Sequence, residues 1–88
     1  MELRQLVYLD AVVRHGGFTR AAEHLRVAQP AVSVQIRRLE TEVGAQLLQR
    51  TTRSVALTHA GELFLDRARR ALAELDAARD ALARLAGG

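Results

Sequence analysis

Cysteine and lysine are both absent from this chain of 88 residues, and aromatic residues make up only 3% of it. Without cysteine the chain has no disulfide, no thiolate zinc site and no cysteine nucleophile. No apolar run approaches the roughly 18 residues of a membrane span, and charges interrupt the N-terminal stretch where a secretion signal would lie. The length excludes a catalytic domain joined to a regulatory one. We therefore expect a small, cytoplasmic, helical protein whose modest core is helped by a partner chain.

All 13 basic residues are arginine, against 10 acidic residues, which gives a net charge of +3. The planar guanidinium group suits phosphates and guanine edges and so favours a nucleic-acid ligand, although a genomic bias towards arginine codons would give the same composition. Residues 1–58 hold eight arginines against five acids, whereas residues 59–88 hold five of each. The excess positive charge therefore lies in the first two thirds, as expected if that part meets a polyanion and the remainder meets protein.

Apolar spacing predicts three helices in the first half of the chain. Gly16 and Gly17 end the first helix, because glycine tolerates the left-handed cap conformation, and Gly44 closes the third. Thr19 is the N-cap candidate of a second helix of about two turns. A tight connection then leads to Pro30, which suits the first turn of a third helix over 29–43 because its missing N–H is not needed there. A short helix, a tight turn and a longer helix form a helix-turn-helix over about 18–37.

The third helix has one apolar and one polar face. Its buried stripe is predicted to consist of Val32, Ile36, Leu39 and Val43. About 100° per residue places an unusual set on the opposite face, namely Pro30, Val34, Arg37 and Thr41, flanked by Ser33 and Arg38. Two arginines, a hydroxyl and an exposed valine favour contact with a groove of DNA, and the alternative is an ordinary solvated helix face.

The second half predicts a short hairpin over 49–58, with Arg50 and Arg53 near its tip, and then a long final helix over 59–86 that Thr58 caps. A heptad pattern in that helix predicts a seam for pairing with a second copy, formed by Phe64, Ala68, Ala71, Leu75, Ala78, Leu82 and Leu85. The fold class expected is mainly α, a winged helix-turn-helix of three helices and a two-stranded wing, followed by a long linker helix.

Three runs in the chain resemble a known family. The segments FTRAAEHLRVAQPAVSVQIRRLE (18–40), VGAQLLQR (43–50) and LTHAG (57–61) are similar to the N-terminal domain of LysR-type transcriptional regulators. The resemblance implies a winged helix-turn-helix domain at 1–58 and a dimerising linker helix at 59–86. It also implies that the 88 residues are the DNA-binding part of a regulator whose large effector-binding domain is missing here.

The resemblance places the recognition helix on the predicted third helix, where it matches Gln29, Pro30, Ala31, Ser33, Gln35, Arg37 and Arg38. By the chemistry of their side chains, Gln29 could pair with adenine and Ser33 with a base edge or phosphate. Arg37 or Arg38 could contact phosphate. Arg53 resembles the wing residue that reaches towards the minor groove, where narrow A·T tracts attract arginine. Arg50 lies close behind it, and pairing with the domain's own carboxylates is the alternative for that residue. The DNA-binding residues expected are Thr19, Gln29, Pro30, Ala31, Ser33, Val34, Arg37, Arg38, Arg50 and Arg53.

Val34 departs from the family pattern, which very often has arginine directly after Ser33. Valine cannot donate a hydrogen bond, so a base or phosphate contact common in the family is in doubt. We hypothesise that Val34 packs on a thymine methyl group, because it stands at the centre of the exposed face. The alternative is neutral drift, with base reading moved to neighbouring residues.

The functional reading is a sequence-specific DNA-binding domain of a transcription factor, acting on an interrupted two-fold operator as a homodimer or as a tetramer of the parent protein. We expect no enzyme activity, no cofactor and no metal, since the three histidines lack ligand spacing and no nucleophile lies beside a base. Glu40 is expected to pair with an arginine inside the domain. The alternative function is a helical protein-interaction module, in which the final helix is functional and the helix-turn-helix only a scaffold.

Overall fold

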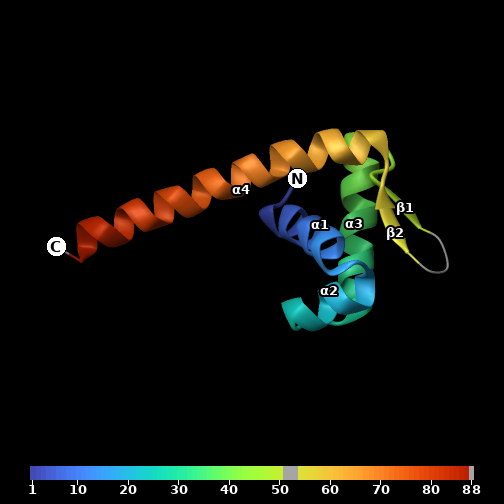
Figure 1. Cartoon of the computed structure of the whole chain (residues 1–88), viewed down its shortest axis with the longest axis horizontal. Helices are drawn as coiled ribbons and strands as arrows, with labels where there is room; N and C mark the ends of the chain where they lie inside the picture. Colours follow the sequence, from blue (N-terminus) through green and yellow to red (C-terminus); the bar gives the residue numbers. More distant parts are fainter. Residues whose placement is uncertain (51–53, 88) are drawn as a thin grey trace.

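The structure is a computed structural model that describes residues 1–50 and 54–87. The elements are α1 (Leu3–His15), α2 (Phe18–Leu25), α3 (Gln29–Val43), β1 (Leu48–Arg50), β2 (Val55–Leu57) and α4 (His59–Ala86). In Figure 1 the first three helices and the hairpin gather at one end, and α4 runs away from them as a long arm. The predicted fold class, a winged helix-turn-helix followed by a long helix, is confirmed.

The helix ends follow local chemistry with one exception. Gly16 and Gly44 end α1 and α3 in the left-handed conformation, with φ of 77° and 72°, as predicted. The prediction that Thr19 caps α2 is wrong, because Gly17 is the N-cap and Thr19 is already the second residue of the helix. Phe18 begins α2 and packs against the core, so the helix starts earlier in the chain than a Thr19 cap would allow. The side chain of Thr19 is left exposed on the outer surface.

The core lies between α1, α2, α3 and the hairpin. The predicted stripe of α3 is confirmed at Val32, Ile36 and Leu39, which are fully buried, while Val43 is half-buried. Leu9 and Val12 of α1 meet this stripe, as do small alanines of α2. Fully burying a branched apolar side chain is worth about 1.5–3 kcal/mol, so this small cluster fixes the orientation of α3.

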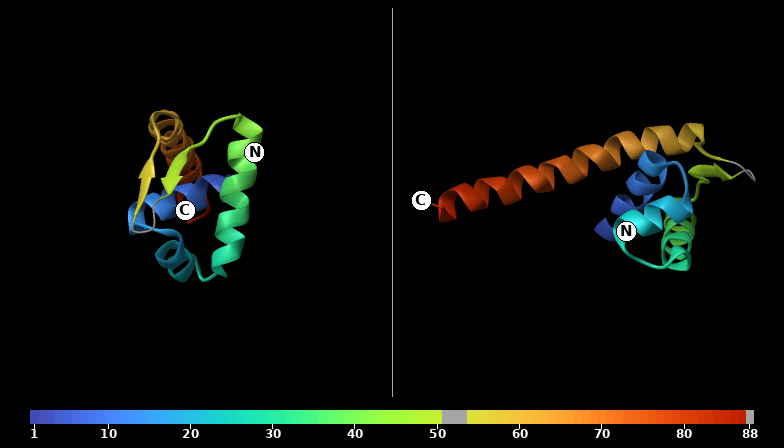
Figure 2. Two further views of the ribbon diagram at one scale, coloured as in Figure 1. Left: turned by 90° about the vertical axis from the view of Figure 1, so that its right-hand side faces the viewer. Right: turned by 60° about the horizontal axis from the view of Figure 1, so that its bottom comes forward.

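The hairpin has short strands and leans on the helices. β1 and β2 run antiparallel, with Leu48 opposite Leu57 and Arg50 opposite Val55. Leu48 is fully buried in the helical core, which supplies the support that an isolated two-stranded hairpin lacks. The left view of Figure 2 shows α3 and the hairpin facing the viewer together, at the end opposite the free end of α4.

Helix α4 starts inside the domain and then leaves it. The predicted cap is confirmed, since the Thr58 hydroxyl accepts a hydrogen bond from the Gly61 amide at 2.9 Å. A Cβ atom at Gly61 would collide with the carbonyl oxygen of Leu47, so glycine allows α4 to approach the segment before β1. Within the described ranges, no helix is both long and apolar enough to cross a bilayer.

The predicted seam of α4 divides into a covered and a free part. Ala68 is only 4% exposed and Phe64 packs against the core, so the domain itself covers much of this end of the seam. The prediction of Ala68 as a dimer contact is not supported, because its side chain is already buried within a single chain. The free apolar positions lie further along, at Leu75, Leu82 and Leu85, which are 44%, 66% and 80% exposed.

We predict that Gly61→Ala lowers the free energy of unfolding by about 3 kcal/mol, because the new methyl group meets backbone that cannot yield. Urea unfolding followed by circular dichroism measures the loss. Gly17→Ala is the matched control, since no atom lies within 4 Å of its Cβ position, and it should cost below about 1 kcal/mol. Equal losses in the two variants would contradict the close approach.

Candidate nucleic-acid interface

The outer face of α3 is the side turned away from the core, because the opposite side of the helix is buried. Gln29, Pro30 and Ala31 are exposed at the start of the helix, with Pro30 in the first turn as predicted. Val34, Arg37 and Arg38 continue the exposed surface, and Ser33 is half-buried at its margin. The structure therefore brings seven of the ten predicted DNA-binding residues onto one helix.

The centre of this face combines an apolar spot with two cations. Val34 is 40% exposed and lines a shallow cavity of about 420 Å³ together with Arg37, Arg38, Thr41 and Glu42. The Thr41 hydroxyl donates to the Arg37 carbonyl at 3.0 Å, which keeps that side chain on its own helix. Among the described residues, neither Arg37 nor Arg38 has an acidic partner within ion-pair distance. Such a surface offers van der Waals contact at the valine and, beside it, positive charge that can bind an anion.

Two further arginines belong to the helix-turn-helix and were missed by the sequence analysis. Arg20 on α2 and Arg26 in the turn are exposed and form no ion pair with any described residue. Arg26 has φ 60° and ψ 45°, the left-handed conformation that favours glycine. The sequence could have indicated Arg26 by its position in the tight turn before Pro30, since that connection must reverse the chain within three residues.

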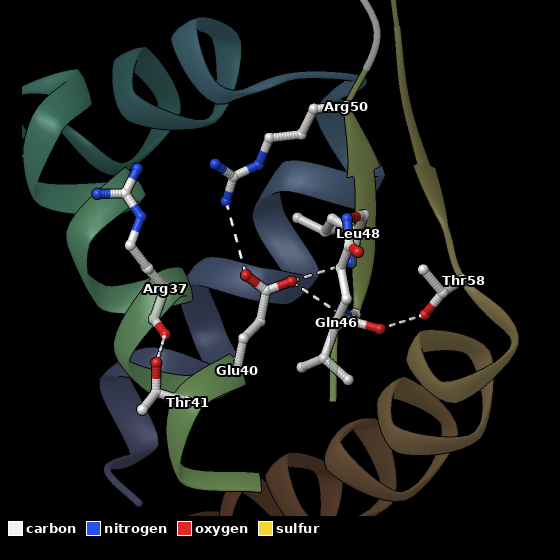
Figure 3. A network of polar contacts seen from close by, with 8 residues as sticks. Arg37, Glu40, Thr41, Gln46, Leu48, Arg50 and Thr58 are labelled. Carbon is white, nitrogen blue, oxygen red and sulfur yellow. Dashed lines mark hydrogen bonds and ion pairs between the residues drawn. The ribbon is translucent and has the colours of Figure 1, made fainter. Parts of the chain in front are cut away.

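Glu40 joins α3 to the hairpin. One oxygen of its carboxylate accepts hydrogen bonds from the amides of Leu47 and Leu48, at 2.8 and 3.2 Å. The other oxygen lies 3.8 Å from a guanidinium nitrogen of Arg50, as Figure 3 shows. The predicted internal pairing of Glu40 with an arginine is therefore confirmed. This carboxylate fixes where the hairpin begins relative to the recognition helix.

Arg50 points from β1 towards α3 rather than away from the domain (Figure 3). Its guanidinium carbon lies 4.6 Å above the centre of the Phe18 ring, in addition to its contact with Glu40. These contacts support the alternative that Arg50 is tied to the domain's own carboxylates. Arg53, the predicted minor-groove residue, lies outside the described residues.

Gln35 belongs to the matched recognition segment but faces inwards. Its side-chain oxygen accepts a hydrogen bond from the Gln5 amide at 3.2 Å, and both residues are buried. Gln5 in turn accepts from the amide of Glu2, so this pair links the start of α1 to the middle of α3. The residue therefore holds the helix in place and is removed from the base-reading set.

Two of the histidines lie together, although the sequence gives them no ligand spacing. The rings of His15 and His24 are 4.2 Å apart at the ends of α1 and α2, tilted by 33°. In the part of the chain that the structure describes, no group of three metal-ligating side chains is found.

Comparison with known families gives one match over most of the chain. A family model described as bacterial regulatory helix-turn-helix protein, lysR family, matches residues 3–62. The chain is 55% identical over 78 residues to the HTH-type transcriptional regulator BudR of Klebsiella aerogenes, covering 89% of this chain and 54% of that protein. It is 51% identical over 73 residues to the HTH-type transcriptional regulator TfdT of Cupriavidus pinatubonensis, covering 83% and 32%. The chain thus spans about a third to a half of these two relatives.

Solved structures match the whole fold. The BenM DBD in its complex with catB site 1 DNA superposes with a TM-score of 0.94 and 44% identity, covering 100% of this chain and 99% of that one. The CbnR DBD in its DNA complex gives 0.87 and 42%, over all of both chains. Full-length CbnR, a LysR family transcriptional regulator, gives 0.84 and 43%, over 96% of this chain and 29% of that one.

We predict that Glu40→Ala lowers the free energy of unfolding by about 1–3 kcal/mol, because it leaves two partly buried backbone amides without their acceptor. Chemical denaturation measures the loss. Glu42→Ala is the matched control on the same helix, because among the described residues its 49% exposed carboxylate pairs only with the chain's amino terminus. A cost for Glu42→Ala as large as that for Glu40→Ala would contradict the role given to the backbone contacts.

Proposed function

Because this chain belongs to the lysR family of bacterial regulatory helix-turn-helix proteins, we propose that it is the DNA-binding part of a transcriptional regulator. In this proposal residues 1–58 read double-stranded DNA, and residues 59–86 form a linker helix that pairs with a second copy. The site of action is the bacterial nucleoid in the cytoplasm. The effector and the direction of regulation belong to the parent protein.

The observation that carries the proposal is the outer face of α3. Most of its inner face is fully buried, while Arg37 and Arg38 stand exposed beside Val34 and form no ion pair with any described acid. A helix presented in this way fits the major groove, with its N-terminal residues next to base edges. In the proposed complex Gln29 and Ser33 read bases or phosphate, and the two arginines contact phosphates.

Pairing through α4 gives the geometry for a two-fold operator. Leu75, Leu82 and Leu85 leave apolar surface on the arm that a single chain does not cover. Two copies joined there would place their recognition helices in successive major grooves, about 34 Å apart. Affinity would come largely from phosphate contacts and would fall steeply with salt concentration.

The test is selection of binding sites from a randomised pool of DNA duplexes at near-physiological salt. We expect enrichment of an interrupted two-fold-symmetric motif, which reports specific reading by a dimer. Enrichment of a single half-site would overturn the dimer but keep the DNA-reading role. No enrichment, together with self-association through α4, would overturn the DNA-binding proposal in favour of a protein-interaction module.

Charge reversal on α3 should weaken DNA binding more than the same reversal on α4. We expect Arg37→Glu and Arg38→Glu each to cost at least about tenfold in affinity and to flatten the dependence on salt, because a phosphate contact is lost. Arg79→Glu changes the net charge equally on the free arm and is the control. Titration of the selected duplex by fluorescence anisotropy at several salt concentrations measures both quantities. The same loss in all three variants would point to a general charge effect.

The contact of Val34 with a thymine methyl group is tested by changing its chemistry. A buried methyl is worth about 0.8 kcal/mol, so Val34→Arg should lower the preference for thymine at one position by about fourfold. Val34→Thr keeps one methyl group at nearly the same volume and should retain most of that preference. Repeated selection with each variant gives the base preferences. Unchanged preference at every position in Val34→Arg would contradict the contact.

A further inference from the structure

Helix α4 is attached to the domain only by its first turns. Its buried residues are Gly61, Leu65 and Ala68, whereas every residue from 73 to 87 is exposed. The molecule consequently measures 51 × 26 × 18 Å, and the arm that extends its longest axis is α4 (Figure 1). The direction of this arm depends on the few contacts made where it leaves.

The last polar contact before the arm becomes free is made by Asp10 of α1. One carboxylate oxygen accepts a hydrogen bond from the guanidinium Nε of Arg69 at 2.7 Å, and the other accepts from Nε of Arg14 at 2.8 Å. The Asp10 side chain is only 19% exposed, so solvent screens the pair less than it screens an open surface pair. Among the described residues, this is the one ion pair that ties α4 to another element.

The charge of Asp10 is maintained by its partners. Burial by itself would raise the pKa of the Asp10 carboxyl group, but hydrogen bonds and charges from Arg69 and Arg14 outweigh it and hold the pKa below its ordinary value. Asp10 is therefore ionised wherever the domain is folded near neutral pH. Its interaction with Arg69 is lost only when acid protonates the carboxylate.

Apolar packing ends within one turn of this pair, because Leu72 is half-buried and residues 73–87 of the chain are exposed. An open cavity of about 350 Å³ follows between α1 and α4, lined by Val7, Asp10, Arg14, Arg69, Leu72, Ala73 and Asp76. None of the described side chains fills this space, so packing there gives α4 little resistance to a sideways rotation. The ion pair at its edge is the contact placed to do so.

A small rotation at Arg69 is amplified along the arm. The helix runs 17 residues further to Ala86, which at 1.5 Å per residue is about 25 Å. A rotation of about 10° therefore moves the end by about 4 Å, close to the 3.4 Å rise of one base pair.

We propose that Asp10 and Arg69 form a brace that sets the angle of α4 and, through it, the number of base pairs between the two half-sites of an operator. Both are positioning residues and contact no DNA. The inference rests on the proposed function, because the angle has this consequence only where α4 pairs with a second copy. Arg14 holds the same carboxylate from within α1 and, among the described residues, forms no ion pair with α4.

The angle itself is measured by double electron–electron resonance on the whole chain. The absence of cysteine allows Glu23→Cys on α2 and Asp80→Cys on α4 to carry the two spin labels. Dilution with unlabelled chain removes distances between copies. We expect a narrow distance distribution in the parent chain and a shift or broadening of at least about 3 Å in Arg69→Gln and in Asp10→Asn.

Arg14→Gln is the matched control, because it removes the other arginine from the same carboxylate but leaves the ion pair between Asp10 and Arg69 of α4 in place. It should leave the distance distribution unchanged. Circular dichroism establishes that each variant is folded before its distances are compared. An unchanged distribution in folded Arg69→Gln would overturn the brace.

The consequence for DNA is measured by selection from duplexes in which two half-sites are separated by spacers of different length. The parent chain should choose one spacing, and Arg69→Gln should accept spacings one or more base pairs away with single half-site affinity within about twofold of the parent. An unchanged spacing despite an altered distance distribution would overturn the link to DNA. Failure of the parent chain to select any DNA would overturn the proposed function, while the spin-label distances still decide the brace.

Discussion

The fixed position of α3 is the constraint on which the rest of the structure depends. Fully buried apolar side chains hold the middle of this helix, and two of its polar residues bind neighbouring elements. Gln35 is bound to α1 through Gln5, and Glu40 is bound to the backbone at the start of β1. Removing one partner of a buried polar contact costs more than the contact contributes, so these anchors specify one placement of the helix. The helix that carries the outer face is thereby in place before any ligand arrives, so binding need order only its exposed side chains.

Features that depend on near neighbours in the chain were predicted well. The glycine caps of α1 and α3, the Thr58 cap and the buried stripe of α3 each involve residues within about four positions of one another. The N-cap of α2 was misplaced at Thr19 because Phe18 packs against a core that the local pattern does not contain. Periodicity thus indicates which residues share a face, and tertiary packing decides where the helix begins.

Contacts between distant segments were not predictable in the same way. Gln35 and Ala68 carried patterns that fitted an exposed role, but each meets a partner surface brought in by the fold. Asp10 and Arg69 lie 59 residues apart, and only the Asp10–Arg14 spacing of four gave any local sign of an ion pair. The two roles considered for Arg50 of β1 likewise depend on contacts with other elements, namely Glu40 of α3 and Phe18 of α2.

The left-handed conformation of Arg26 places stability and charge in competition at one residue. A side chain with a Cβ atom in this conformation costs on the order of 1 kcal/mol relative to glycine, because Cβ crowds the following carbonyl oxygen. Evolution towards a higher working temperature would therefore find an easy gain in replacing this arginine by glycine or asparagine. The gain would remove one positive charge from the turn that precedes the recognition helix, so heat resistance and attraction for a polyanion cannot both be maximised there.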